Sequence, residues 1–159
     1  MIRQATYNPT YPPTSFAENE TVVDNKLSIN YDEHSETLEI KWEGSVNSHE
    51  VRQGYSVIME YVQLYKPAKW LLDLHSRDKI KRSDQRWVFT YFFPEALRVV
   101  GSNVFVAVIL PVSASHELVH ELDGDELIQN ENFMIINHFL YREAAQRWLS
   151  LDKSVKAGA

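Results

Sequence analysis

The 159-residue chain contains no cysteine, which excludes disulfide bonds, catalytic thiolates, iron–sulfur clusters and cysteine-based zinc sites. It also lacks any apolar run near the ~20 residues that cross a bilayer, so we expect no membrane insertion. Positive charge is scarce. The 16 Lys and Arg residues against 22 Asp and Glu give a net charge of −6, which disfavours nucleic-acid binding. Residues 1–15 lack the apolar core of a signal peptide, and we therefore expect a cytoplasmic protein.

What remains is ordinary globular material, with 44% hydrophobic and 24% charged residues. The length suits one domain. Three prolines at 9, 12 and 13 without an apolar period predict an irregular arm over residues 1–20. The predicted domain covers residues 21–152, and residues 153–159 form a short tail.

The apolar pattern predicts alternating strands and helices. The expected strands cover residues 27–31, 38–42, 70–74, 104–110 and 133–139. The expected helices begin near Asn47, Ser83, Ser115 and Tyr141, and Pro94 should interrupt the second of them. The polar residues 32–36 join the first two strands as a hairpin. Residues 104–110 are apolar throughout and should lie at the sheet centre.

This order predicts an α/β fold. We expect a mixed, mostly parallel sheet of about five strands, with an N-terminal hairpin and about four helices packed on it.

The element order and six short strings resemble the STAS-like family, the fold of the bacterial anti-sigma-factor antagonists. The strings are INYDE at 29–33, LEIKWEG at 38–44, KWLLD at 69–73, DQRW at 84–87, FPEA at 93–96 and AAQRWL at 144–149. The resemblance covers about residues 21–151. It implies a small single-domain bacterial protein with a regulatory, non-enzymatic role and no cofactor. In the antagonists a phosphorylatable serine opens the helix after the third strand, and Ser83 holds that position here.

Residues 77–86 form the one concentrated basic segment of the sequence. They include five basic and two acidic residues, whereas the other 149 residues carry 11 basic and 20 acidic. The segment links a predicted central strand to a helix start, where open α/β sheets bind ligands and free N–H groups favour anions. We expect Ser83 to be the N-cap residue of that helix. A phosphate on Ser83 is the alternative, and it would lie among Arg77, Lys81, Arg82 and Arg86.

Two further features flank the basic segment. Asp73 and His75 share one side of a strand, as a hydrogen-bonded pair or as the orienting pair of a general base. Five aromatic residues lie within positions 87–93, more than one helix face can bury, so Phe89 or Phe93 should line a pocket or a subunit contact. The predicted ligand or partner site comprises Asp73, His75, Arg77, Lys81, Arg82, Ser83, Arg86 and Trp87.

Residues 116–120 spell H-E-x-x-H, the one enzymatic signal in the chain. On a helix, His116 and His120 would share a zinc ion while Glu117 polarised a bound water. The candidates for a third ligand are Glu126, Glu131, His138 and Glu143. Leu118, Val119 and Leu122 instead predict an ordinary helix with a polar outer face, and we expect no metal.

The sequence therefore favours a cytoplasmic regulatory or interaction module. It would dock a protein partner, a second copy of itself or a small anionic ligand through residues 75–93. The alternatives are a small zinc-dependent hydrolase and a module that binds an apolar or lipid-like ligand.

Overall fold

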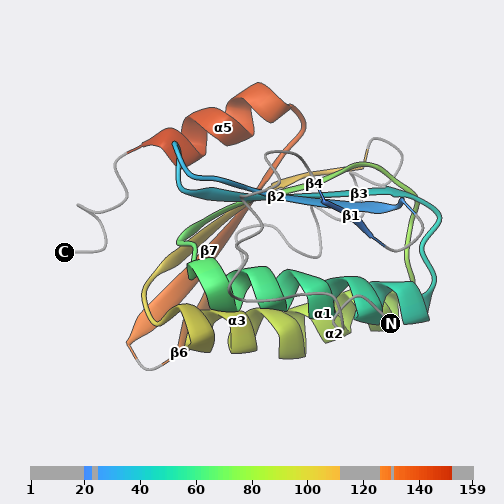
Figure 1. Ribbon diagram of the computed structural model, residues 1–159, viewed down its shortest axis with the longest axis horizontal. Helices are drawn as coiled ribbons and strands as arrows, with labels where there is room; N and C mark the ends of the chain where they lie inside the picture. The colour runs from blue at the N-terminus through green and yellow to red at the C-terminus, as the bar shows by residue number, and fades with distance from the viewer. Residues whose placement is uncertain (1–19, 23–24, 112–125, 130, 152–159) are drawn as a thin grey trace.

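The computed structural model describes residues 20–22, 25–111, 126–129 and 131–151, and these form a seven-stranded mixed sheet (Figure 1). Its strand order is β1-β2-β3-β4-β5-β7-β6. The strands are β1 (Glu20–Val22), β2 (Leu27–Asp32), β3 (Thr37–Gly44), β4 (Lys69–Arg77), β5 (Val104–Ile109), β6 (Glu126–Gln129) and β7 (Asn132–Phe139). The four central strands β3, β4, β5 and β7 run parallel, and antiparallel neighbours flank them. The predicted α/β class and N-terminal hairpin are confirmed.

The helices cover both faces of this sheet. They are α1 (Ser48–Tyr65), α2 (Arg82–Trp87), the π-helical segment η3 (Val88–Phe92), α3 (Phe93–Val100) and α5 (Arg142–Ser150). Figure 1 shows α1, α2 and α3 on one face and α5 on the other. The expected helix at 115–124 and the H-E-x-x-H string lie outside the described residues. None of the described helices combines the length and the apolar character needed to span a bilayer.

Helix α1 begins and ends where the sequence predicts. The Asn47 side chain accepts from the Glu50 N–H at 2.8 Å, and the Glu50 carboxylate accepts from the Asn47 N–H at 2.9 Å. This reciprocal capping box satisfies two donors that the first turn leaves open. Lys66 adopts the left-handed conformation at φ 46°, and Pro67 prevents the helix from continuing.

The helix over residues 82–100 continues through Pro94. Pro94 has no N–H, so a regular α-helix would lose a bond at this point. The chain instead widens into η3, whose end is marked by the Phe93 N–H donating to the Val88 carbonyl five residues back. The predicted interruption at Pro94 is therefore a π-helical segment inside one continuous helix over residues 82–100.

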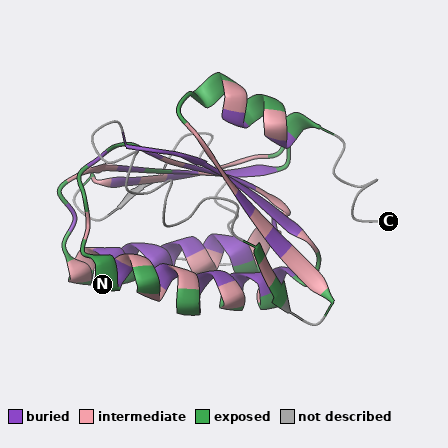
Figure 2. Cartoon of the chain, turned by 180° about the vertical axis from the view of Figure 1, so that it is seen from behind, coloured by how far each residue is buried: buried purple, intermediate pink, exposed green. Residues whose placement is uncertain are grey.

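Two buried clusters stabilise the layers. The larger cluster lies between the sheet and the α1–α2–α3 face and includes the fully buried Trp42 and Trp70. The smaller lies beneath α5 and includes Phe105 and Leu149. All six residues of β5 are buried, as predicted for a central strand. Figure 2 shows the buried positions turned inward on each helix.

Candidate functional site

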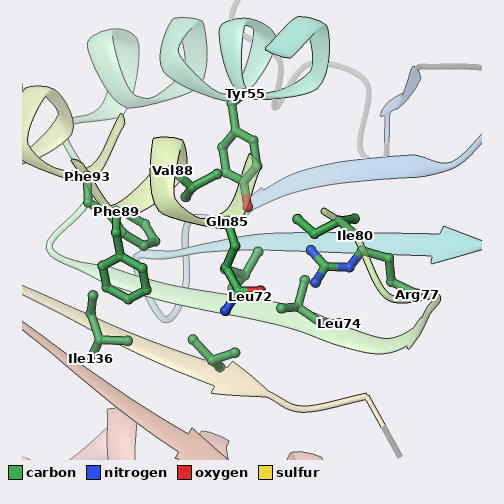
Figure 3. Close-up of a pocket in the computed structure, with 11 residues that line it drawn as sticks. Tyr55, Leu72, Leu74, Arg77, Ile80, Gln85, Val88, Phe89, Phe93 and Ile136 are labelled. Carbon is green, nitrogen blue, oxygen red and sulfur yellow. The ribbon is translucent and has the colours of Figure 1, made fainter. Parts of the chain in front are cut away.

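A bulge in β4 turns Arg77 toward the larger core cluster. Lys41 pairs with Asp73, but two residues later Glu43 pairs with Ser76, so β4 carries one extra residue. In a regular strand Arg77 would share the face of Asp73. The extra residue shifts the alternation by one position, and Arg77 pairs with Gly44. Its side chain consequently lies on the same side as Leu72 and Leu74, toward α1 and α2 (Figure 3).

Arg77 lines a cavity of about 40 Å³ between the sheet and the helices. Most of the lining is hydrocarbon, and the polar contributions come from Arg77, Tyr55 and Gln85 (Figure 3). The apolar lining residues are Leu72, Leu74, Ile80, Val88, Phe89, Phe93, Val108 and Ile136. The cavity is partly open to solvent, and Ile80, Gln85 and Phe89 are its half-buried lining residues.

The guanidinium of Arg77 is buried without a counterion in the described part of the chain. Only 7% of the residue is exposed. Its Nε donates to the Asp78 carbonyl at 3.2 Å, and among the described residues neither Nη nitrogen has an acceptor and no carboxylate forms an ion pair with it. Burial lowers the pKa of Arg77, and the group still carries its charge at neutral pH. A buried cation with open N–H donors is a strong anion-binding element.

Tyr55 supplies a second polar group from α1. Burial raises the pKa of its phenol, with the nearby Arg77 charge acting in the opposite direction. The phenol is therefore protonated at neutral pH and able to donate a hydrogen bond. Its ring is held by Phe92 at 4.6 Å and Trp42 at 5.5 Å between ring centroids, so the hydroxyl has a fixed direction.

Asp73 and His75 do not belong to this cavity. Asp73 lies on the α5 side of the sheet, where its Oδ2 accepts from Arg142 at 3.4 Å. Its Oδ1 accepts the backbone N–H of His75 at 2.9 Å. The hydrogen-bonded pair exists, but its donor is the backbone N–H of His75 and β4 is an internal strand rather than an edge. The bulge places Asp73 and Arg77 on opposite faces of the sheet, so the structure does not bring Asp73 and His75 together with Arg77.

The other basic residues of the site prediction lie on α2, with Lys81 and Arg82 at its start and Arg86 in its last turn. Lys81, Arg82 and Arg86 are exposed, whereas Arg77 is withdrawn into the cavity. Ser83 is also exposed, but it is not the N-cap residue. Lys81 takes that position and no side chain caps the helix. The N-cap position lies two residues earlier than predicted, which moves the Ser83 hydroxyl out of capping geometry.

Two residues of α2 face α1 instead of the cavity. The Asp84 carboxylate is buried, accepts from Ser48 Oγ at 2.7 Å and lies 3.9 Å from Arg52. It joins α2 to α1 through these contacts. Trp87 is half-buried beneath the Arg52 guanidinium, which lies 4.4 Å from its ring centroid. Trp87 therefore belongs to the α1–α2 packing rather than to the site.

The four candidates for a third zinc ligand, Glu126, Glu131, His138 and Glu143, are all described residues. Nowhere within the described ranges do three His, Cys, Asp or Glu side chains gather as a metal site. The zinc hypothesis depends on His116, Glu117 and His120, which lie outside those ranges.

With this geometry in hand, the chain was compared with known proteins. Neither the family models nor the curated protein sequences gave a match.

Sequence reasoning identified only part of the cavity. Arg77 was predicted as a site residue, and Phe89 and Phe93, the two candidates for pocket lining, both line it. Tyr55, Leu72 and Leu74 were assigned to the core, and nothing in their local pattern indicates that they border a cavity. The five basic and two acidic residues of positions 77–86 identify this segment as basic. They do not indicate that Arg77 is the basic residue that is buried.

Proposed function

We propose that this chain is a non-enzymatic binding module of STAS-like type that takes up a small anion in the cavity lined by Arg77. The supporting observation is a guanidinium that is 7% exposed, faces an apolar cavity and has no described carboxylate partner. The sequence predicts that a partner or an anionic ligand docks somewhere within residues 75–93. The proposal places the anion in the cavity lined by Arg77.

Energetics support this proposal. A buried charge without a partner costs several kcal/mol, and proteins normally keep one only where it is compensated or used. A bound anion would compensate the charge and stabilise the folded protein in proportion to its concentration over its Kd. Arg77 would thus couple ligand binding to stability.

The chemistry of the lining supports binding over catalysis. The described lining residues offer no carboxylate, imidazole or aliphatic hydroxyl to act as a base or nucleophile. The Tyr55 phenol has a raised pKa and is a poor base at neutral pH. A STAS-like regulatory role in the cytoplasm is part of this proposal, and it is supported by the element order and by the position of Ser83 in the first turn of α2.

Thermal unfolding with a panel of anions tests the proposal. We would titrate acetate, nitrate and inorganic phosphate into the wild-type protein, Arg77→Met and the control Arg147→Met, which changes an exposed arginine on α5. At least one anion should raise the Tm of the wild type and of the control but not of Arg77→Met. Equal responses in all three proteins would overturn the proposal.

A second candidate function is docking of an acidic protein partner at the start of α2. It is favoured by the exposed Lys81, Arg82 and Arg86 and by Tyr91, which is 65% exposed further along the same helix. Replacing the three basic residues by alanine should abolish retention of partners without changing anion binding in the cavity. Retention of the same partners by this variant would exclude the surface.

A further inference from the structure

We infer that the ligand of the Arg77 cavity is a monocarboxylic acid with a short apolar tail. This inference rests on the proposed function and specifies its ligand class. The observation behind it is that one planar cationic group, with the neutral Tyr55 and Gln85, borders a space whose other lining residues are apolar (Figure 3).

The charge of the site matches a monoanion. Arg77 is the sole cation among the described lining residues, and Tyr55 and Gln85 add only neutral polar groups. A dianion such as inorganic phosphate would enter with one charge uncompensated in an apolar surrounding, which is costly. A carboxylate brings one charge and places two oxygens in the plane that a guanidinium fork recognises.

The size of the cavity also matches a carboxylate. One water-sized sphere occupies about 10–15 Å³ of such a space, so about 40 Å³ takes about three heavy atoms. A carboxylate consists of three heavy atoms. Carbons beyond it would extend toward the partly open side of the cavity.

The rest of the lining suits an alkyl tail. Phe89 and Phe93 meet edge to face with ring centroids 5.4 Å apart and form an apolar wall. The half-buried Ile80 and Phe89 are apolar surface that a tail would cover. Burial of each methylene there should tighten binding by up to about fourfold.

The test is a calorimetric titration of the full chain at neutral pH with acetate, propionate, butyrate and hexanoate. Inorganic phosphate and hexanol are the comparison ligands. Affinity should rise by about two- to fourfold per methylene from acetate to butyrate, while phosphate and hexanol bind at least about tenfold more weakly than hexanoate.

Three variants make the result specific. Arg77→Met should lose carboxylate binding, and Arg77→Lys, which keeps the charge but not the fork, should bind at least about tenfold more weakly. Arg147→Met should bind like the wild type. Near-UV circular dichroism shows whether each variant is folded. If Arg77→Met does not fold, the comparison of Arg77→Lys with the wild type still tests the proposal.

The outcomes separate the two proposals. If acetate or phosphate binds through Arg77 but longer tails add nothing, the proposed function stands and the apolar acid is wrong. If hexanol binds as tightly as hexanoate, recognition by Arg77 is wrong for this ligand class. If no anion in either panel responds to Arg77 replacement, both proposals fail.

Discussion

Arg77 illustrates how one residue can be retained at a cost in stability. It is buried with its charge, and its described contact is a single bond from Nε to a backbone carbonyl. An apolar side chain of similar length would fill the same space without desolvating a charge. We therefore expect Arg77 to lower the stability of the ligand-free protein.

Arg77→Met should therefore stabilise the ligand-free protein by about 1–3 kcal/mol, because it removes a buried charge that no carboxylate of the described residues compensates. Urea denaturation at neutral pH measures the change. Arg147→Met, at an exposed position, should stay within about 0.5 kcal/mol of the wild type. A strongly destabilised Arg77→Met would indicate that Arg77 has a structural partner and would contradict this account.

For Asp84 we expect the opposite effect on stability, because its buried carboxylate has partners. Asp84→Ala should destabilise the protein by about 1–3 kcal/mol, because Ser48 and Arg52 lose the acceptor that joins α1 to α2. Asp84→Asn, which keeps one acceptor oxygen, should lose less. Denaturation midpoints of both variants provide the measurement, and an unchanged Asp84→Ala would refute the role of this contact.

The carboxyl group of Glu50 should make the stability of the protein depend on pH. Its pKa is lowered by the Asn47 N–H that donates to it and by the Lys26 ammonium 3.0 Å away. A carboxyl with a lowered folded pKa contributes stability above its unfolded pKa of about 4.3, and that stability is lost as the pH falls through the folded pKa.

The variant Glu50→Gln keeps a side chain able to close the capping box but removes the charge. At pH 7 it should be less stable than the wild type by about 0.5–1 kcal/mol. The gap should close as the pH falls below about 4. Urea denaturation at several pH values gives this difference, and a gap independent of pH would show that the charge of Glu50 contributes nothing.

At the element scale, a single glycine sets how closely α1 approaches the sheet. A Cβ built on Gly54 would lie 2.2 Å from Trp42 Cη2 and 3.0 Å from a Leu27 methyl. Both neighbours are fully buried and have no free space in which to move. The glycine therefore reflects packing, despite its low helix propensity.

Gly54→Ala should destabilise the protein by about 1–2 kcal/mol, since the overpacking penalty exceeds the gain of about 1 kcal/mol in helix propensity. Ser56→Ala, on the exposed side of α1, is the matched control and should be neutral or slightly stabilising. Chemical denaturation compares the two. A stabilised Gly54→Ala would mean that α1 shifts away from Trp42 easily.

The elements also show where sequence patterns succeed. Strands β2, β3, β4, β5 and β7 were all predicted because their apolar residues alternate or run continuously. Strand β6 (Glu126–Gln129) was left unassigned because a four-residue edge strand has too few positions to show a period. Pro94 correctly indicated an interruption, but the lost hydrogen bond does not specify that the helix will widen into a π-helical turn.

At the scale of the whole molecule, the site lies at the point where the sequence pattern fails. A single extra residue in β4 reverses the face of everything after it, and no residue type in the segment HSR at 75–77 signals that shift. The sequence alone therefore presents residues 77–86 as one basic segment. In the structure Arg77 is buried, whereas Lys81, Arg82 and Arg86 are exposed on α2.

The molecule as a whole presents Arg77 from the rigid centre of the fold. The cavity is lined by strands β4, β5 and β7, helix α1, the α2–η3–α3 helix and Ile80 of the loop between β4 and α2. Because most of the lining comes from helices and strands, we expect the site to be largely preorganised.

The most direct measurement is a crystal structure of the protein with butyrate. The account predicts the carboxylate inside the cavity, with its oxygens about 2.7–2.9 Å from the Arg77 Nη atoms and its alkyl carbons against Phe89. A structure in which the acid lies on Lys81 and Arg82 at the helix start, with the cavity empty, would contradict it.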